Sequence, residues 1–460
     1  MKVLLTGATG LIGHELGLEL VRRGHEVCVV SRRKEAAQDV PYPCRVLQGD
    51  LSKGPLPSGM LTDIEGVIHL MGESVASGRW TAERRRRILD SRVLSTRHLI
   101  QSLESAPLKV FVSASAVGYY GDRGDETLTE DSKPGSDFLS EVCQAWEREV
   151  FSLKDRGPQV RVAAVRLGIV LSAFGGALTK MLTPFRLGLG GPFGKGDQWM
   201  SWIHLRDAVG IFTRVLEDAS LDGVVNGVAP EPVTNREFSR ELGACFGKGL
   251  APAVPSAALK LGFGEMSEAL LGSQRVMPTV MQKAGYRFEY PNLKSALAEA
   301  TSLYADGDMI LRSQQYFDVP PEKIFPFFAE AQNLERITPP LLGFHIEKMS
   351  TPEIEEGSLI DYRLKIHGVP VKWRTRIEEW VPGKRFVDTQ LKGPYKKWHH
   401  THNFEKLGRG TLMTDLVRYR VPLGWAGWFA SGWMVEKDVN QIFDYRRQYC
   451  ARHFSEKNQG

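Results

Sequence analysis

The chain has 460 residues, of which 42% are hydrophobic and 25% are charged, and its formal net charge at pH 7 is +5. This length predicts two or three domains, and the composition is typical of a soluble globular protein and argues against widespread disorder. The charge is small for the length, which argues against a nucleic-acid partner. The basic run 84–87 precedes apolar residues at helical spacing, so we interpret it as a solvated helix face, with phosphate contact as the alternative.

The five cysteines are widely spaced and form no Cys-x-x-Cys pair. This pattern predicts reduced thiols in a cytoplasmic protein and argues against a disulfide framework or a zinc site. The chain begins directly with a predicted strand, without the charged and apolar regions of a secretory signal. The uncharged stretch 421–435 is shorter than the roughly 20 residues of a membrane span, so we expect no stable membrane insertion and interpret the stretch as a covering helix, with an interfacial segment as the alternative.

The first predicted unit is a strand, a glycine turn and a helix. Residues 2–5 suit a buried strand, glycines follow at three-residue intervals, and Glu26–Val30 predicts the next strand. Such glycines allow a tight turn, close approach of the backbone to a pyrophosphate and close packing of the helix, whose N-terminus faces the phosphate. The residues predicted to bind a dinucleotide here are Gly7, Thr9, Gly10, Leu11, Ile12 and Gly13.

The second strand is followed by Ser31, Arg32 and Arg33. At this point of a dinucleotide-binding unit, an acidic residue accepts a hydrogen bond from the ribose 2′-hydroxyl of NAD. A serine and two arginines instead neutralise a 2′-phosphate. We therefore predict NADP as the cofactor.

Further strands are predicted at 46–48, 66–70 and 109–113, with helical patterns between them. This alternation predicts an α/β fold with a doubly wound parallel sheet, in which ligands bind outside the carboxyl ends of the strands. The residues expected at that edge, along the cofactor, are Asp50, Leu51, Leu70, Met71, Gly72, Glu73 and Ser113.

Several segments of the first 302 residues carry a family resemblance. They are GESVASGRW, SASAVGYYG, GSDFLSEVCQAWE, VRLGIVLS, PFRLGLGGPFGKGDQWMSWIH and NGVAPEPVTNREF, together with GEMSEALLGSQRVMP and GYRFEYPNLKSAL in the closing part. This part of the chain resembles the extended (atypical) short-chain dehydrogenase/reductase superfamily, in particular its sugar-nucleotide epimerase branch with the SDR39U1-like proteins. The resemblance implies a Rossmann domain over 1–302, with 251–302 as a small substrate-side subdomain. It also implies an NADP-dependent epimerase or oxidoreductase for a sugar nucleotide or a small carbonyl or hydroxyl compound.

The superfamily's proton-transfer pair is missing from the matching helix. The superfamily uses a tyrosine and a lysine four residues apart, and this sequence has Phe138 and Val142 at those positions. Residues 134–153 contain neither a tyrosine nor a lysine, so a shift in register does not restore the pair. A phenyl ring and an isopropyl group cannot move protons. Any chemistry must therefore use other groups.

The catalytic candidates are residues that the end of the fifth strand and the next helix bring toward the nicotinamide. Tyr119 or Tyr120 is a candidate acid, Ser115 a group that orients a substrate oxygen, and Glu141 a base if burial raises its pKa. Each has packing or turn formation as its alternative role. Arg166 and Arg186 are candidates for binding an anionic substrate through two-pronged contacts.

The missing pair also supports a non-enzyme alternative, a catalytically silent protein in which NADP regulates ligand binding. A lipid carrier at the membrane surface is a further alternative, and it depends only on the tryptophan-rich stretch 421–435.

A different pattern begins at residue 309 and continues to 460. A short helix at 321–328 is followed by predicted strands at 343–349, 357–366, 372–381, 385–391, 395–404 and 411–421, and by a C-terminal helix at 433–453. With an edge strand at 311–317, these elements predict a curved antiparallel sheet around one long helix.

The segments that carry a second resemblance are FAEAQNLERITPPLLGF, WRTRIEEWVPGKRFVDTQLKGPYKKWHHTHNFE and TDLVRYRVPLG. They resemble the SRPBCC or START-like superfamily, in its cyclase/dehydrase branch, which implies an α+β helix-grip domain with an apolar or lipid-like ligand in a cavity.

Three histidines in this second domain invite a test for metal binding. On a strand, His400 and His402 share one face and His399 points to the other. Because at most two histidines converge, without a carboxylate or cysteine partner nearby, we predict no metal site. The tryptophans at 425, 428 and 433 either line the cavity or pack in the core.

Overall fold

In the computed structural model the described residues are 1–76, 78–156, 159–304, 307–422 and 424–456. The chain forms two compact units, one of Met1–Ala37 with Cys44–Ser302 and one of Gln38–Pro43 with Leu303–Gly460. Among the described residues, no helix combines the length and the apolar character needed to cross a membrane.

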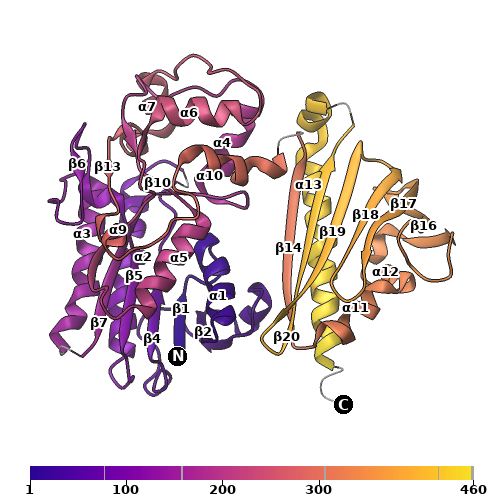
Figure 1. The fold of residues 1–460 in the computed structure, drawn as a ribbon, viewed down its shortest axis with the longest axis horizontal. Helices are drawn as coiled ribbons and strands as arrows, with labels where there is room; N and C mark the ends of the chain where they lie inside the picture. The colour runs from indigo at the N-terminus through magenta and orange to yellow at the C-terminus, as the bar shows by residue number, and fades with distance from the viewer. Residues whose placement is uncertain (77, 157–158, 305–306, 423, 457–460) are drawn as a thin grey trace. The chain divides into compact units, whose positions relative to one another are not determined.

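The first unit is built on a seven-stranded parallel sheet in the order β11-β7-β5-β4-β1-β2-β3 (Figure 1). Helix α1 packs against α5, and α2 packs against α3. This arrangement confirms the predicted Rossmann-like doubly wound fold. The strands of this sheet are β1 (Lys2–Thr6), β2 (Glu26–Ser31), β3 (Arg45–Gln48), β4 (Gly66–His69), β5 (Val110–Ala116), β7 (Arg161–Leu167) and β11 (Gly223–Gly227). The helices among them are α1 (Leu11–Arg22), α2 (Ala82–Ser102), α3 (Phe138–Phe151), α4 (Gly176–Arg186) and α5 (Leu205–Glu217).

Short elements beyond the main sheet complete this unit. Three two-stranded pairs join β8 to β10, β9 to β12 and β6 to β13. Their bounds are β6 (Thr127–Leu128), β8 (Ile169–Leu171), β9 (Trp199–Met200), β10 (Trp202–His204), β12 (Val233–Thr234) and β13 (Arg275–Val276). The helices here are α6 (Asn235–Ala244), α7 (Ser256–Phe263), α8 (Met266–Leu271), α9 (Thr279–Lys283) and α10 (Leu293–Thr301). Short 3-10 helices are η1 (Lys34–Asp39), η2 (Val117–Tyr120), η3 (Ser152–Arg156) and η4 (Ser302–Tyr304).

The second unit is a seven-stranded antiparallel sheet in the order β14-β20-β19-β18-β17-β16-β15, with the long helix α13 along it (Figure 1). This arrangement is consistent with the predicted helix-grip fold, and β14 is at the sheet edge as predicted. The strands are β14 (Met309–Phe317), β15 (His345–Met349), β16 (Leu359–Ile366), β17 (Val369–Val381), β18 (Arg385–Lys392), β19 (Lys397–Leu407) and β20 (Gly410–Arg420). The helices are α11 (Pro321–Ala329), α12 (Ala331–Arg336), η5 (Pro340–Leu342) and α13 (Gly424–Glu456).

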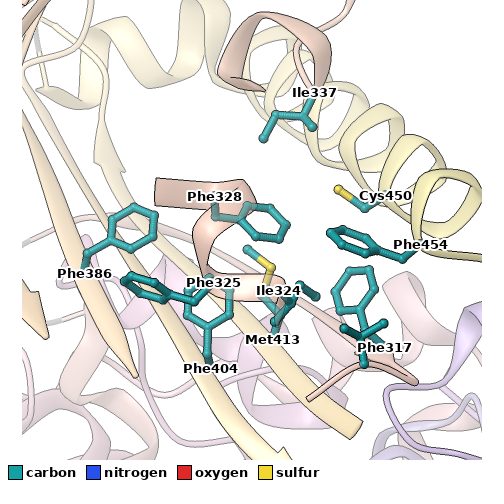
Figure 2. Close-up of a cluster of buried hydrophobic side chains, with 11 residues drawn as sticks. Phe317, Ile324, Phe325, Phe328, Ile337, Phe386, Phe404, Met413, Cys450 and Phe454 are labelled. Carbon is teal, nitrogen blue, oxygen red and sulfur yellow. The ribbon is translucent and has the colours of Figure 1, made fainter. Parts of the chain in front are cut away.

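An aromatic core lies between this sheet and its helices. Figure 2 shows side chains of α11, such as Phe325 and Phe328, beside Phe404 of β19 and Phe454 of α13. The ring centroids of Phe325 and Phe404 are 5.2 Å apart, in an edge-to-face arrangement. Such pairs add roughly 0.5–1.5 kcal/mol each beyond the burial of their apolar area. This core therefore fixes the position of α13 on the sheet.

Candidate functional site

The glycine turn between β1 and α1 is closed so tightly that side chains do not fit. Gly7 has φ +69°, and a Cβ atom there would lie 2.9 Å from the carbonyl carbon of Leu70. A Cβ atom at Gly13 would lie 2.3 Å from the carbonyl oxygen of Gly7. The residue before α1 is Gly10, which provides no side-chain cap. The backbone at the start of α1 can therefore approach an anionic group closely.

The other residues predicted for this turn differ in exposure. Thr9 is exposed, whereas Leu11 and Ile12 are half-buried in the first turn of α1. At the end of β2, Ser31 Oγ accepts a hydrogen bond of 3.1 Å from the backbone N–H of Arg33. The side chains of Arg32 and Arg33 are exposed. A serine and two exposed arginines thus follow the second strand.

The residues that follow β3 and β4 have defined structural contacts. Asp50 accepts from the hydroxyl of Ser52 at 2.5 Å, and the carbonyl of Leu51 lies 2.8 Å from His98 Nδ1. The backbone N–H of Leu70 donates to the Thr6 hydroxyl at 3.3 Å.

Beyond Leu70, the chain runs beside α2. Met71 is half-buried, and a Cβ atom at Gly72 would lie 3.0 Å from the guanidinium carbon of Arg92. The Glu73 carboxylate forms ion pairs with Arg84 and, at 3.7 Å, with Arg87. Two of the four arginines in the basic run 84–87 therefore form ion pairs with Glu73.

A buried carboxylate that the sequence analysis missed, Glu147 of α3, organises the end of β5. Ser115 Oγ donates to Glu147 Oε1 at 2.6 Å, and Arg166 of β7 donates to both carboxylate oxygens at 2.8 and 2.7 Å. Burial alone would lower the pKa of Arg166, but Glu147 raises it above its usual value. Glu147 is the last residue of the quoted motif GSDFLSEVCQAWE, and no local pattern distinguishes it from a solvated helix residue.

The two candidate tyrosines have different environments. The Tyr120 hydroxyl donates to Asn226 Oδ1 at 2.7 Å and accepts from Arg166 at 3.0 Å. Burial raises the pKa of Tyr120 to about 12. The Tyr119 ring instead lies under the Arg166 guanidinium, with 3.3 Å between its centroid and the guanidinium carbon. Among the described residues, none hydrogen-bonds the Tyr119 hydroxyl, which leaves this group available for a ligand.

The remaining candidates have other environments. Ser113 is fully buried and donates to the carbonyl of Ala114 at 2.9 Å. Glu141 is exposed in the first turn of α3, so the burial on which its role as a base depends is absent. Arg186 is the last residue of α4 and is half-buried.

The positions of the missing pair are filled by apolar packing. Val142 is 2% exposed and belongs to a cluster with Trp80, Ile88 and Met266. The Phe138 ring packs on the edge of this cluster, 5.2 Å from the Trp80 ring. The absence of tyrosine and lysine is therefore matched by surrounding side chains that suit apolar groups.

The second unit contains a cavity of about 750 Å³ between its sheet and helices. Most of its lining is apolar and includes Phe328, Ile337, Leu364, Trp373, Phe386 and Phe443. Trp433 is 68% exposed and is not part of this lining, and the side chains of Trp425 and Trp428 lie outside those described.

A group of buried polar residues forms one part of the cavity wall, and it corrects the sequence analysis. His400 Nε2 lies 2.9 Å from Asp415 Oδ1, and His402 Nε2 lies 3.1 Å from Asp388 Oδ2. The inference that no carboxylate is near these histidines was wrong, because the neighbouring strands β18 and β20 supply both aspartates. Burial lowers the pKa of His400 to about 4, whereas Asp388 and Asp415 outweigh burial and raise the pKa of His402.

Comparison with known proteins divides the chain along the same lines. The NAD dependent epimerase/dehydratase family matches residues 3–226, and a domain of unknown function, DUF1731, matches residues 254–300. Epimerase family protein SDR39U1 from Bos taurus is 38% identical over 306 residues, which are 65% of this chain and 99% of the relative. The chain belongs to the SDR39U1 epimerase family. The resemblance predicted from the N-terminal motifs is thus confirmed.

Solved structures agree with this family. The crystal structure of human SDR39U1 with NADPH matches with a TM-score of 0.59 and 37% identity, over 66% of this chain and 99% of that one. A nucleoside-diphosphate sugar epimerase from Corynebacterium glutamicum matches with a TM-score of 0.52 and 34% identity, over 65% of this chain and 58% of that one.

The second unit of this SDR39U1-family chain has its own match. The family described as polyketide cyclase / dehydrase and lipid transport matches residues 317–443, which confirms the second resemblance.

Proposed function

We propose that the first unit binds NADP(H) and acts as an epimerase-like oxidoreductase on a sugar nucleotide or a small carbonyl or hydroxyl compound. The observation that carries this proposal is the glycine turn before α1, together with Ser31, Arg32 and Arg33 after β2. Human SDR39U1, which was solved with NADPH, supports the choice of cofactor. The second unit would bind an apolar or lipid-like ligand in its cavity.

The glycine turn and the residues after β2 would contact different parts of the cofactor. The start of α1 would face the pyrophosphate with backbone N–H groups, which favour negative charge. Ser31 and the two arginines would hold the 2′-phosphate, because guanidinium groups form two-pronged contacts with phosphate oxygens. When bound, NADP(H) supplies or accepts a hydride at its nicotinamide ring.

Tyr119 is the candidate for the accompanying proton. In reduction of a carbonyl, its hydroxyl would donate a proton to the substrate oxygen while the carbon receives the hydride, and the resulting phenolate would regain a proton from water. Arg166 lies across the Tyr119 ring and is itself held by both oxygens of Glu147. Glu147 and Arg166 are thus positioning residues for Tyr119.

A thermal-unfolding assay with each dinucleotide tests cofactor choice. NADP should raise the unfolding temperature more than NAD at equal concentration, because the stabilisation by a ligand of the folded state increases with the logarithm of its concentration divided by its Kd. Arg32→Ala and Arg33→Ala should abolish this difference, whereas Arg86→Ala, an 84% exposed residue of α2, should preserve it. Equal shifts for the two dinucleotides would contradict NADP specificity.

Turnover needs a separate test. With NADPH and a panel of aldehydes, ketones and sugar nucleotides, the protein should oxidise the cofactor, and Tyr119→Phe should lower kcat by about 100-fold or more. Glu141→Gln should retain the activity, because Glu141 is exposed in the first turn of α3 and takes no part in the contacts that join Glu147, Arg166 and Tyr119.

A second function, an NADP-responsive ligand-binding protein without turnover, is favoured by the apolar packing at Phe138 and Val142. In that case NADP would bind, no compound of the panel would be reduced, and Tyr119→Phe would leave cofactor binding unchanged. Cofactor binding together with Tyr119-dependent turnover would exclude this alternative.

We further propose that the protein works in a reducing compartment such as the cytoplasm. All five cysteines are free, and three of them are buried. Cell fractionation with an antibody to the chain tests this location, and recovery in an oxidising compartment would contradict it.

A further inference from the structure

We propose that Asp388, His400 and His402 bind a divalent transition-metal ion in the wall of the cavity of the second unit. One ligand atom from each residue can be chosen so that all three lie within 4.8 Å of one another. The three residues come from adjacent strands, and all three line the cavity. This inference is independent of the function proposed for the first unit.

The sheet brings the ligands together through its register. Asp388 of β18 is directly opposite His400 of β19. His402 follows two residues later, and alternation along a strand places it on the same face as His400. Their ring centroids are 3.7 Å apart. Three ligands are therefore held by backbone pairing rather than by a loop.

The distances suit a small ion. Asp388 Oδ2 lies 3.4 Å from His400 Nδ1 and 3.1 Å from His402 Nε2. With metal–ligand bonds of about 2.0–2.1 Å, neighbouring ligand atoms around a tetrahedral ion are separated by about 3.3 Å. An ion could thus lie among these atoms with small side-chain movements.

A second carboxylate stands on the far side of both imidazole rings. Asp415 Oδ1 lies 2.9 Å from His400 Nε2 and 2.8 Å from His402 Nδ1. The latter nitrogen is buried and lacks an aligned hydrogen bond, so a small ring rotation would let it donate to Asp415. Carboxylates that accept from the outer nitrogen of a metal-bound histidine fix the ring and increase its basicity. Asp415 therefore fits the role of a positioning residue.

The net charge at the site indicates which ligand would fill the remaining coordination position of the ion. Arg446 lies 3.3 Å from Asp415 Oδ1 and balances the negative charge of this carboxylate. A divalent ion bound to the Asp388 carboxylate would therefore keep a net charge of about one positive unit at the site. Three protein ligands leave a coordination position for water or a substrate. Because the rest of the cavity is mainly apolar, an anionic oxygen on an apolar molecule, such as a fatty carboxylate, matches this position.

Titration of the metal-free full chain with Co²⁺ tests the site, since its visible absorption reports nitrogen and oxygen ligands. We expect one ion per chain. Asp388→Asn and His400→Gln should weaken binding at least 100-fold, and Asp415→Asn by about 10- to 100-fold. His399→Gln is the matched control, because His399 lies on the other face of β19, 3.7 Å from Glu378, and should bind Co²⁺ as the unaltered chain does.

Two further measurements keep the test decisive. Circular dichroism must show that each variant is folded. If the unaltered chain binds neither Co²⁺ nor Zn²⁺, that result alone overturns the proposal. Equal binding by Asp388→Asn and His399→Gln would also overturn it. Added octanoate should change the Co²⁺ spectrum of the unaltered chain, and an unchanged spectrum would contradict an open position that takes an anionic oxygen.

Discussion

At the scale of single residues, Glu147 connects helix α3 to two strands of the first unit. Glu147 belongs to α3 and is 5% exposed. Its carboxylate accepts hydrogen bonds from the Ser115 hydroxyl of β5 and from the Arg166 guanidinium of β7. A buried carboxylate is stable only when it is paired and hydrogen-bonded, and here both conditions hold. Glu147 therefore fixes Arg166, and through it the two tyrosines.

Glu147→Gln should destabilise the protein by about 3–5 kcal/mol, because Arg166 would keep a buried charge without its partner. Urea unfolding at pH 7 measures this change. Glu141→Gln, on the exposed face of the same helix, is the control and should change the free energy of unfolding by at most about 0.5 kcal/mol. Similar values for the two variants would contradict the assigned role of Glu147.

Gly13 is the glycine of the turn with least space. Gly13→Ala should abolish the stabilisation by NADP, because its methyl group would lie 2.3 Å from the carbonyl oxygen of Gly7 and displace the turn. Thermal unfolding with and without NADP measures the effect. Gly54→Ala is the control, since no atom lies within 4 Å of a Cβ built there, and it should retain the shift.

At the scale of elements, a buried histidine joins two strands and two helices. His69 of β4 lies 2.7 Å from the Thr6 hydroxyl of β1 and 3.0 Å from the Thr96 hydroxyl of α2. Trp146 of α3 donates to the same Thr96 hydroxyl at 3.1 Å. Burial lowers the pKa of His69 to about 3, so the imidazole is neutral in the folded protein.

This histidine predicts a loss of stability in mild acid. The unfolded chain binds a proton at His69 below its usual pKa of about 6.5, whereas the folded chain does not until about pH 3. The contribution of neutral His69 to the free energy of unfolding is therefore complete above about pH 6.5. It decreases as the pH is lowered, by about 2 kcal/mol at pH 5. Urea unfolding of the His69→Gln variant and of the unaltered chain at several pH values isolates the contribution of His69. The same pH dependence of the free energy of unfolding in both proteins would contradict the prediction.

Helix α13 shows how element boundaries depend on tertiary contacts. The helical spacing predicts its start at residue 433, whereas the covering helix expected for 421–435 agrees with the observed start at Gly424. Glycines at 424, 427 and 432 each disfavour a helix by about 1 kcal/mol relative to alanine, which hides the pattern. Packing on the sheet compensates for such local costs in long amphipathic helices.

At the scale of the whole molecule, the chain consists of two units with separate cores. In the second unit, Asp308 is close to three cations of the sheet and pairs with Lys397 at 2.6 Å, Arg420 at 2.6 Å and Arg418 at 3.1 Å. Burial would raise the pKa of Asp308, but Lys397 and Arg420 hold it below its usual range. This carboxylate joins β14 to β19 and β20 at the beginning of the second unit.

Two unfolding transitions should follow from the two cores. Asp308→Asn should lower the transition of the second unit by on the order of 2 kcal/mol, because three cations would lose their shared partner, and should leave the NADP-sensitive transition unchanged. Calorimetry with and without NADP separates the two. Asp361→Asn removes a half-exposed pair with Arg374 in the same sheet, and this control should cost at most about 1 kcal/mol.

The sequence alone determined the family, the glycine turn, the strands predicted up to residue 113 and most elements of the second unit, because these depend on residues near one another in the chain. Glycine spacing, apolar periodicity and the absence of tyrosine and lysine at 138 and 142 are all local features. Only the tertiary structure revealed the partnership of Glu147 with Arg166 and the approach of Asp388 and Asp415 to the histidines. Pairing between strands distant in sequence decides which polar groups meet, and it also decides whether burial makes each of them a ligand, a positioning group or part of the core.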